Sequence, residues 1–200
     1  MTSSTFDEGE SVRRTIVSVA LIVLVLMLAS GVALAATING TNRADLLIGT
    51  PQQDLIKGFG GDDSIRGKGA RDTLRGYGGN DNVTGDRGND AMFGGSGADD
   101  MRGLAGNDDL YGGPGADDLY GGPGDDTIFG AEGNDTTDGE AGSDDLHGGP
   151  GNDRIIAGTG ADHRVFAGDG EQDLICVDPN SGGEIVTDDP EDEFIFNKSF

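Results

Sequence analysis

Aspartate recurs every nine residues from Asp45 to Asp162, fourteen times without a slip. A glycine lies five residues before each of these aspartates except the last, where Ala157 stands. A second glycine lies two residues before the aspartate in eleven of the fourteen units. The three units without it carry Arg43, Gln52 and Ala70 there. So regular a pattern predicts a tandem array of one nine-residue structural unit.

A carboxylate set among glycines suits the binding of a hard cation. Glycine permits positive φ values and close backbone approach, so a glycine-rich turn can aim carbonyl oxygens inward. Ca²⁺ takes six to eight oxygen ligands, including backbone carbonyls, whereas softer metals favour His or Cys. The chain has two histidines, His147 and His163, which we interpret as solvated, and one cysteine, Cys176. We interpret Cys176 as a small buried apolar residue, with an intermolecular disulfide as the alternative.

The residue two positions after each aspartate is apolar, except at Thr137 and Arg164. We therefore divide each unit into a six-residue turn and a three-residue strand whose middle side chain points inward. Two units make one coil of eighteen residues, so fourteen units predict an all-β, parallel β-roll of about seven coils. One predicted inward ladder reads Leu47, Ile65, Val83, Met101, Leu119, Thr137, Ile155. The other reads Ile56, Leu74, Met92, Leu110, Ile128, Leu146, Arg164.

Residues 112–120 and 121–129 match the pattern G-G-x-G-x-D-x-U-x, where U is apolar. Over residues 40–165 the chain resembles the repeats-in-toxin, or haemolysin-type, calcium-binding family. The resemblance implies a right-handed solenoid in which each Ca²⁺ lies between loops eighteen residues apart, held by aspartate carboxylates and backbone carbonyls. It also implies roughly nine ions here, with doubtful sites in the loops that end at Asp45, Asp54 and Asp72.

The metal ligands implied by the resemblance are the aspartate of each strong loop and the second glycine of every strong loop after the first. The aspartates are Asp63, Asp81, Asp90, Asp99, Asp108, Asp117, Asp126, Asp135, Asp144, Asp153 and Asp162. The glycines are Gly79, Gly88, Gly97, Gly106, Gly115, Gly124, Gly133, Gly142, Gly151 and Gly160.

The charge of the chain argues that calcium binding and folding are one event. The formal net charge is −24, and only 34% of the residues are hydrophobic. Stacked coils place the aspartates in two columns, where carboxylates about 5 Å apart repel by roughly 0.9 kcal/mol in water and about 3.5 kcal/mol at an effective dielectric of 20. Bound Ca²⁺ turns this repulsion into attraction, so we expect the chain to fold as it binds calcium. So acidic a surface also disfavours nucleic acid and anionic lipid as partners.

Residues 1–35 differ from the rest of the chain. Arg13 and Arg14 precede an apolar run that ends in Ala33-Leu34-Ala35. A basic start, an apolar middle and an A-x-A ending predict a secretory signal peptide cleaved after Ala35, and hence an extracellular protein. An uncleaved membrane anchor is the alternative, since the run nearly reaches spanning length.

After this segment we expect a short lead over 36–39, a β-roll over 40–167, and a degenerate repeat with a β cap over 168–200. Arg164 closes the regular stack in this interpretation. Asp173 follows Asp162 by eleven residues, and apolar residues then alternate with acids up to Phe196. Such a segment is suited to hide the open apolar end of a roll.

These observations favour a secreted calcium-binding protein. The chain contains no H-E-x-x-H, G-x-S-x-G or P-loop motif, and we expect no enzyme. The alternative is a structural or adhesive cell-surface module. Phe93, Tyr111 and Phe129 recur eighteen residues apart at an outward position and predict an aromatic stripe that contacts a partner or a second copy.

Overall fold

The computed structural model describes residues 34–160, 164–168, 172–177, 184–186 and 192–196. Its contacts divide the chain into two units, Met1–Leu34 and Ala35–Phe200, and all strands of the described residues belong to the second. The segment interpreted as a signal peptide therefore lies almost wholly outside the described residues. Among the residues that are described, no helix is long and apolar enough to cross a membrane.

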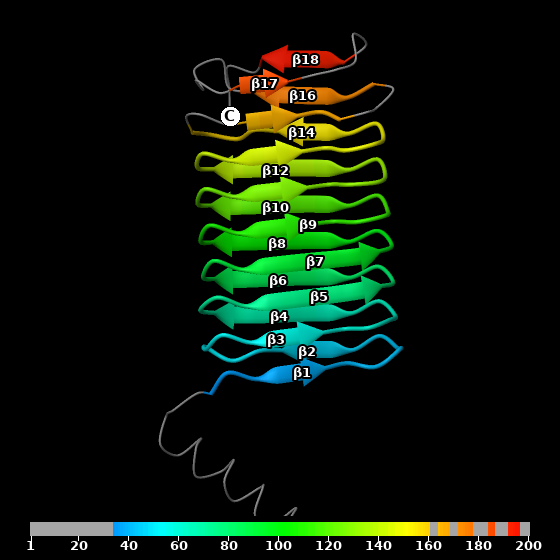
Figure 1. The fold of residues 1–200 in the computed structure, drawn as a ribbon, viewed down its shortest axis with the longest axis vertical. Coiled ribbons are helices and arrows are strands. Elements are labelled where there is room, and N and C mark those ends of the chain that lie inside the picture. Colours follow the sequence, from blue (N-terminus) through cyan, green and yellow to red (C-terminus); the bar gives the residue numbers. More distant parts are fainter. Residues whose placement is uncertain (1–33, 161–163, 169–171, 178–183, 187–191, 197–200) are drawn as a thin grey trace, which may run out of the picture. The chain divides into compact units, whose positions relative to one another are not determined.

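Eighteen short strands in the described residues form two parallel sheets of nine strands each (Figure 1). Sheet one contains β1 (Thr37–Asn39), β3 (Leu55–Lys57), β5 (Thr73–Gly78), β7 (Ala91–Ser96), β9 (Asp109–Tyr111), β11 (Thr127–Phe129), β13 (Asp145–His147), β15 (Arg164–Phe166) and β17 (Glu184–Val186). Sheet two contains β2 (Leu46–Ile48), β4 (Ser64–Gly69), β6 (Asn82–Arg87), β8 (Asp100–Ala105), β10 (Asp118–Pro123), β12 (Thr136–Ala141), β14 (Arg154–Ile156), β16 (Leu174–Val177) and β18 (Glu193–Phe196).

The chain alternates between the two sheets at every strand, so each pair of strands makes one coil. Within a sheet, each residue of the regular region pairs with the residue eighteen positions later, as Leu119 does with Thr137. This register is the predicted one, because two nine-residue units bring the same repeat position back to the same place. The predicted parallel β-roll is confirmed, with more coils than the expected seven because strands form at both ends of the repeat.

A single row of side chains from each sheet fills the interior. Both predicted ladders are buried from Leu47 to Ile155, and Thr137 is fully buried among them. The core is therefore one side chain deep on each side. So thin a core stabilises the chain less than a packed globular interior does, which leaves an important part of the stability to the turns.

Several strands are longer than expected. Seven of them run for six residues, among them β4 and β12, and include the first three residues of the following turn. The predicted boundary between a three-residue strand and a six-residue turn is wrong for these units. The reason is that the turns also stack in register, so they form parallel pairs such as Lys68 with Asp86.

The prediction that Arg164 points inward is also wrong. The strand β15 is shifted by one residue, so Arg164 is exposed and Val165 is fully buried beside Leu146. The Nη1 atom of Arg164 lies 3.0 Å from Oδ2 of Asp145. An extra residue between the strands permits the shift, which avoids burying a guanidinium in a dry core.

Two further side chains differ from the sequence-based interpretation. Cys176 is only partly buried, because its neighbours Ile175 and Val177 take the inward positions of β16. His147 is half-buried rather than solvated, and its ring stacks between Phe129 and Phe166. His163 lies outside the described residues.

Candidate metal centre

The repeated aspartates form two buried columns, one at each turn of the coil. All of them from Asp54 to Asp153 are at most 3% exposed, although each is a carboxylate in an acidic chain. In both columns the backbone N–H of one aspartate donates to Oδ1 of the aspartate eighteen residues later. For Asp81 and Asp99 this N···O distance is 2.7 Å, and for Asp99 and Asp117 it is 2.8 Å. The columns are therefore tied from coil to coil through one carboxylate oxygen.

The second carboxylate oxygen of these aspartates is buried without a hydrogen-bond partner. Such oxygens belong to Asp63, Asp72, Asp81, Asp90, Asp99, Asp108, Asp117, Asp126, Asp135 and Asp153. Buried polar atoms are normally hydrogen-bonded, and an unsatisfied carboxylate oxygen is among the most costly. A repeated set of ten such atoms indicates that a further group completes them.

Each orphaned oxygen lies beside the first glycine of its own loop. A β-carbon at Gly94 would lie 2.3 Å from Oδ2 of Asp99 and 2.8 Å from the carbonyl oxygen of Gly112, in the next coil. A carboxylate oxygen from one loop and a carbonyl oxygen from the next therefore border the same glycine. Any side chain at this glycine would fill the space between them.

The second glycine of each loop is required by backbone conformation and by close packing. Gly97 has a φ of +129°, and a β-carbon there would lie 1.9 Å from the carbonyl oxygen of Gly79. Positive φ also occurs at seven more of the ten predicted second glycines: Gly79, Gly88, Gly106, Gly124, Gly133, Gly142 and Gly151. The glycine pattern thus holds consecutive turns in direct backbone contact.

The burial of the columns raises the pKa of their carboxyl groups. Desolvation, opposed by the backbone hydrogen bond and reinforced by neighbouring carboxylates, raises the pKa of Asp117 and Asp126 to about 7. The same main cause raises the pKa of Asp153 to about 7 and that of Asp108 to about 6. At neutral pH these columns are therefore poised to take up a cation, either a proton or a metal ion.

Side chains alone do not form a metal cage here. Among the described residues, no group of three or more His, Cys, Asp or Glu side chains is placed to hold a metal ion. The available donors are one carboxylate per loop and the backbone carbonyls around it. This all-oxygen set is suited to Ca²⁺, which accepts carbonyl ligands and flexible coordination, and is unsuited to softer metals.

The first loops differ from the others. Thr50 donates to both oxygens of Asp54, through its backbone N–H to Oδ2 at 2.5 Å and its hydroxyl to Oδ1 at 3.1 Å. Thr41 donates to Oδ2 of Asp45 in the same way. Protein groups therefore already satisfy the oxygen that is orphaned elsewhere. Asp72, by contrast, has the orphaned oxygen, and Ala70 takes the left-handed conformation that a glycine takes in other loops.

The aspartate columns contain residues that the sequence analysis did not assign to the site. Asp173 continues one column, because the N–H of Asp153 donates to its Oδ1 at 2.8 Å. It lies twenty residues after Asp153 rather than eighteen, so the nine-residue count did not reach it. Asp162, a predicted ligand of the other column, lies outside the described residues, whereas Gly160 is described as part of a bend.

A second ladder runs beside the columns, at the position just before each aspartate. The side-chain oxygen of Asn80 accepts the N–H of Ala98 at 3.0 Å, and that of Asp62 accepts the N–H of Asn80 at 2.9 Å. The recurrence of Asn and Asp at this position could have revealed this ladder from the sequence. These exposed residues brace the turns rather than face the buried oxygens.

The comparisons with known proteins agree with this geometry. A model of the RTX calcium-binding nonapeptide repeat matches the chain in four copies, at residues 39–74, 66–101, 102–137 and 138–163. The chain belongs to this calcium-binding repeat family. The matched residues span the aspartate columns up to the end of the regular repeat. None of the curated proteins matches the chain.

Proposed function

We propose that this RTX-repeat protein is a secreted calcium-binding protein that folds as it binds several Ca²⁺ ions between its stacked loops. The observation that carries this proposal is the repeated buried carboxylate oxygen without a hydrogen-bond partner. A folded protein retains such groups only where something compensates them. Membership of a calcium-binding repeat family supports calcium as the compensating ion.

Each ion would be held between one loop and the loop eighteen residues later. The residues that would hold it are the aspartate of a strong loop and carbonyl groups such as that of Gly112. A bound calcium ion supplies two positive charges next to a column of carboxylates. The aspartates in turn fix the separation of successive coils through their hydrogen bonds to the backbone. We expect about nine ions, in line with the number of gaps between strong loops.

The coupling of binding to folding follows from the balance of forces. Adjacent carboxylates of a column lie one strand spacing apart, about 4.8 Å, where an uncompensated pair repels by up to a few kcal/mol. The interior offers only one buried side chain per strand against many such pairs. Without a cation at neutral pH, the repulsion within the columns therefore exceeds the stabilisation that the core provides, and the chain unfolds.

The test is a calcium titration of the protein purified from a secreting host. Circular dichroism in EDTA should show little β structure, and millimolar calcium should restore it together with a compact hydrodynamic radius. Magnesium at the same concentration is the matched control and should substitute poorly, because it demands octahedral geometry and retains its waters. A full β signal and a sharp thermal transition in EDTA at neutral pH would contradict the proposal.

Secretion is part of the same proposal. The basic pair, apolar run and Ala33-Leu34-Ala35 ending support export and cleavage, and an oxidising, calcium-rich exterior suits the site. The mass of the exported protein should correspond to a chain that begins at Ala36. A mass that includes residues 1–35, recovered only from the membrane fraction, would favour the anchor.

A structural or adhesive role is the second candidate, because the predicted aromatic stripe is longer than expected. Five rings stack in a row along the outer face of sheet one: Phe93, Tyr111, Phe129, His147 and Phe166. Their centroids are 4.3–5.1 Å apart, so the ring faces cover one another. Changing Phe93, Tyr111 and Phe129 together to Ser should weaken surface attachment if the stripe binds a partner. Unchanged attachment with lower stability would leave the rings only a stiffening role.

A further inference from the structure

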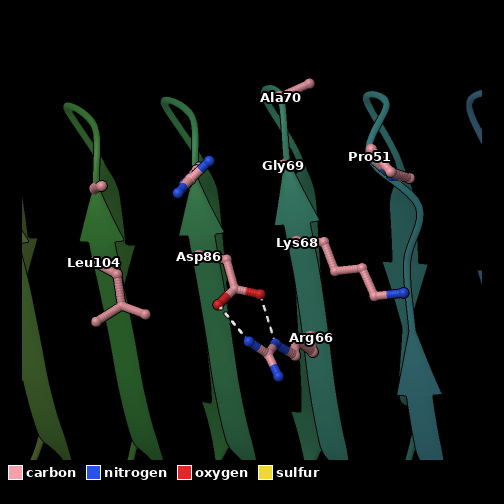
Figure 2. Close-up of a pocket in the computed structure, with 9 residues that line it drawn as sticks. Pro51, Arg66, Lys68, Gly69, Ala70, Asp86 and Leu104 are labelled. Atoms are coloured by element: carbon pink, nitrogen blue, oxygen red, sulfur yellow. Dashed lines mark hydrogen bonds and ion pairs between the residues drawn. The ribbon is translucent and has the colours of Figure 1, made fainter.

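Two of the straight rows of side chains on the outer face of sheet two lie side by side. Parallel pairing aligns one row as Arg66, Thr84, Arg102, Tyr120 and Asp138. It aligns the other row, at the start of the following turn, as Lys68, Asp86, Leu104, Gly122 and Glu140. Figure 2 shows Arg66, Lys68, Asp86 and Leu104 projecting from adjacent strands on the same side. We refer to these two rows as the sheet-two face.

The residues of the second row have positive φ angles. Lys68, Asp86, Leu104 and Glu140 have φ values of 92°, 79°, 72° and 64°. Glycine is the default residue at such a conformation, and other residues there cost on the order of 1 kcal/mol or more each. Lys68, Leu104 and Glu140 are also exposed. The same conformation occurs in the loops of sheet one, at Phe59, Tyr77 and Ala131, so the turn of the repeat imposes it. What distinguishes the sheet-two row is the charge of the side chains that this turn presents to solvent.

The charges on this face are separated along the roll. At its N-terminal end, Arg66, Lys68 and Arg87 line a groove of about 880 Å³, with Asp86 as the only acid among the lining residues. Arg66 donates to Asp86 through Nε and Nη2, at 2.5 and 2.9 Å, and its side chain remains 58% exposed. Two coils beyond Leu104, the corresponding positions hold Asp138 and Glu140. The two rows are therefore basic at one end and acidic at the other.

We propose that the sheet-two face binds the same face of a second copy in a two-fold, antiparallel dimer. A two-fold axis that runs along the strands at Leu104 reverses the order of the coils in the second copy. It places Lys68 opposite Glu140 of the second copy and Arg66 opposite Asp138 of the second copy. Each pair occurs twice by symmetry, and the two exposed Leu104 side chains meet on the axis. Such a self-complementary patch is what an isologous interface requires.

Other alignments of the two copies are less favourable. Moving the axis one coil towards the N-terminus sets Arg66 against Arg102 of the second copy. Moving it half a coil the other way sets Asp86 against Glu140. At the Leu104 axis the like charged groups that meet are the Arg102 and Asp100 side chains of the two copies. Within each copy these two side chains compensate one another, because Nη2 of Arg102 lies 2.9 Å from Oδ2 of Asp100. The charge pattern thus selects one register.

A second copy fits this surface better than an extended peptide. The strands beneath it, β4, β6, β8 and β10, each pair with a neighbour on both sides, so no strand edge is open to an added segment. Recognition must therefore use side chains. Five coils and one strand length give a footprint of roughly 24 by 20 Å per copy, which lies at the lower end for specific interfaces. The dimer is accordingly weak and sensitive to salt.

The dimer presupposes the folded roll of the proposed function, and it depends on calcium through net charge. At −24 per chain, two metal-free copies repel strongly. Bound calcium lowers that repulsion and leaves the local pairs to act. Circular dichroism of each sample in calcium separates a failure to fold from a failure to associate.

The experiment is sedimentation analysis of the calcium-loaded protein from a secreting host, between micromolar and a few hundred micromolar. Wild-type protein should dimerise, and Lys68→Glu or Glu140→Lys alone should weaken dimerisation about tenfold or more, because each creates like-charge pairs. Mixing the two single variants should restore dimers, because opposite charges then face each other at positions 68 and 140 of the two copies. Lys57→Glu on sheet one is the matched control for the charge change and should dimerise like wild type.

Two results would overturn the proposal. One is a wild-type protein that is folded by circular dichroism and monomeric throughout this range. The other is a mixture of the two variants that associates no better than either variant alone. Leu104→Gly provides an independent check, because it removes the side chain on the axis and relieves the strained backbone. It should weaken the dimer and leave the folded monomer at least as stable.

Discussion

Replacing Thr137 with Val should stabilise the calcium-loaded roll. Thr137 is fully buried in the inward ladder, between Leu119 and Ile155, and its hydroxyl has no hydrogen-bond partner within the described structure. A buried hydroxyl without a partner costs about 1–3 kcal/mol, and Val keeps the shape of Thr without that group. We therefore expect a gain of about 1–2 kcal/mol in the free energy of unfolding. Thr137→Ile should add up to about 0.8 kcal/mol more, for one further buried methylene.

The assay is thermal and urea unfolding at saturating calcium, followed by circular dichroism. For a chain of this size, a gain of about 1.5 kcal/mol raises Tm by roughly 3–6 °C. Thr136→Val is the matched control, because Thr136 is adjacent, only partly buried and on the outward side of β12. It should change the free energy by no more than about 0.5 kcal/mol. Equal effects of the two substitutions, or a loss of stability in Thr137→Val, would refute the reasoning.

Three further predictions concern the turns. Gly97→Ala should abolish cooperative folding in calcium, because the new β-carbon would lie 1.9 Å from a carbonyl oxygen. Gly60→Ala is the control and should fold normally in the same circular dichroism assay, because its β-carbon would have no atom nearer than 3.7 Å. Asp126→Asn should lower the calcium stoichiometry measured by calorimetry. Asp54→Asn should leave it unchanged, because Thr50 already satisfies both oxygens of Asp54. An equal loss of bound calcium in the two variants would contradict this ranking. Burial raises the pKa of Asp126 to about 7, so the metal-free roll binds more protons than the unfolded chain between pH 4 and 7. The β signal in EDTA should therefore be largest near pH 4 and fall as the pH rises through 7, and a signal that grows with pH would show the opposite linkage.

The regular part of the fold was predictable because its repeat is strict. A nine-residue period leaves each apolar residue at one inward position, so Leu47 to Ile155 could be placed without a structure. The aspartate columns followed from the same count. Prediction failed where the count slips, at Arg164 and Asp173, because the number of residues in a turn no longer fixes the register there. At those positions the burial of Val165 and Ile175 decides which residue turns inward.

By itself, the sequence determined the parallel roll, the two columns and the calcium chemistry, because all three depend only on residue type and spacing. The tertiary structure decided which carboxylate oxygens are left without a partner and which loops satisfy their own aspartate, as Thr50 does for Asp54. It also decided that the side chains from Lys68 to Glu140, whose backbone has positive φ, share one face with opposite charges at its two ends. Hydrogen-bond satisfaction and backbone strain depend on how one coil meets the next, and a repeat pattern does not specify the positions of individual atoms in that contact.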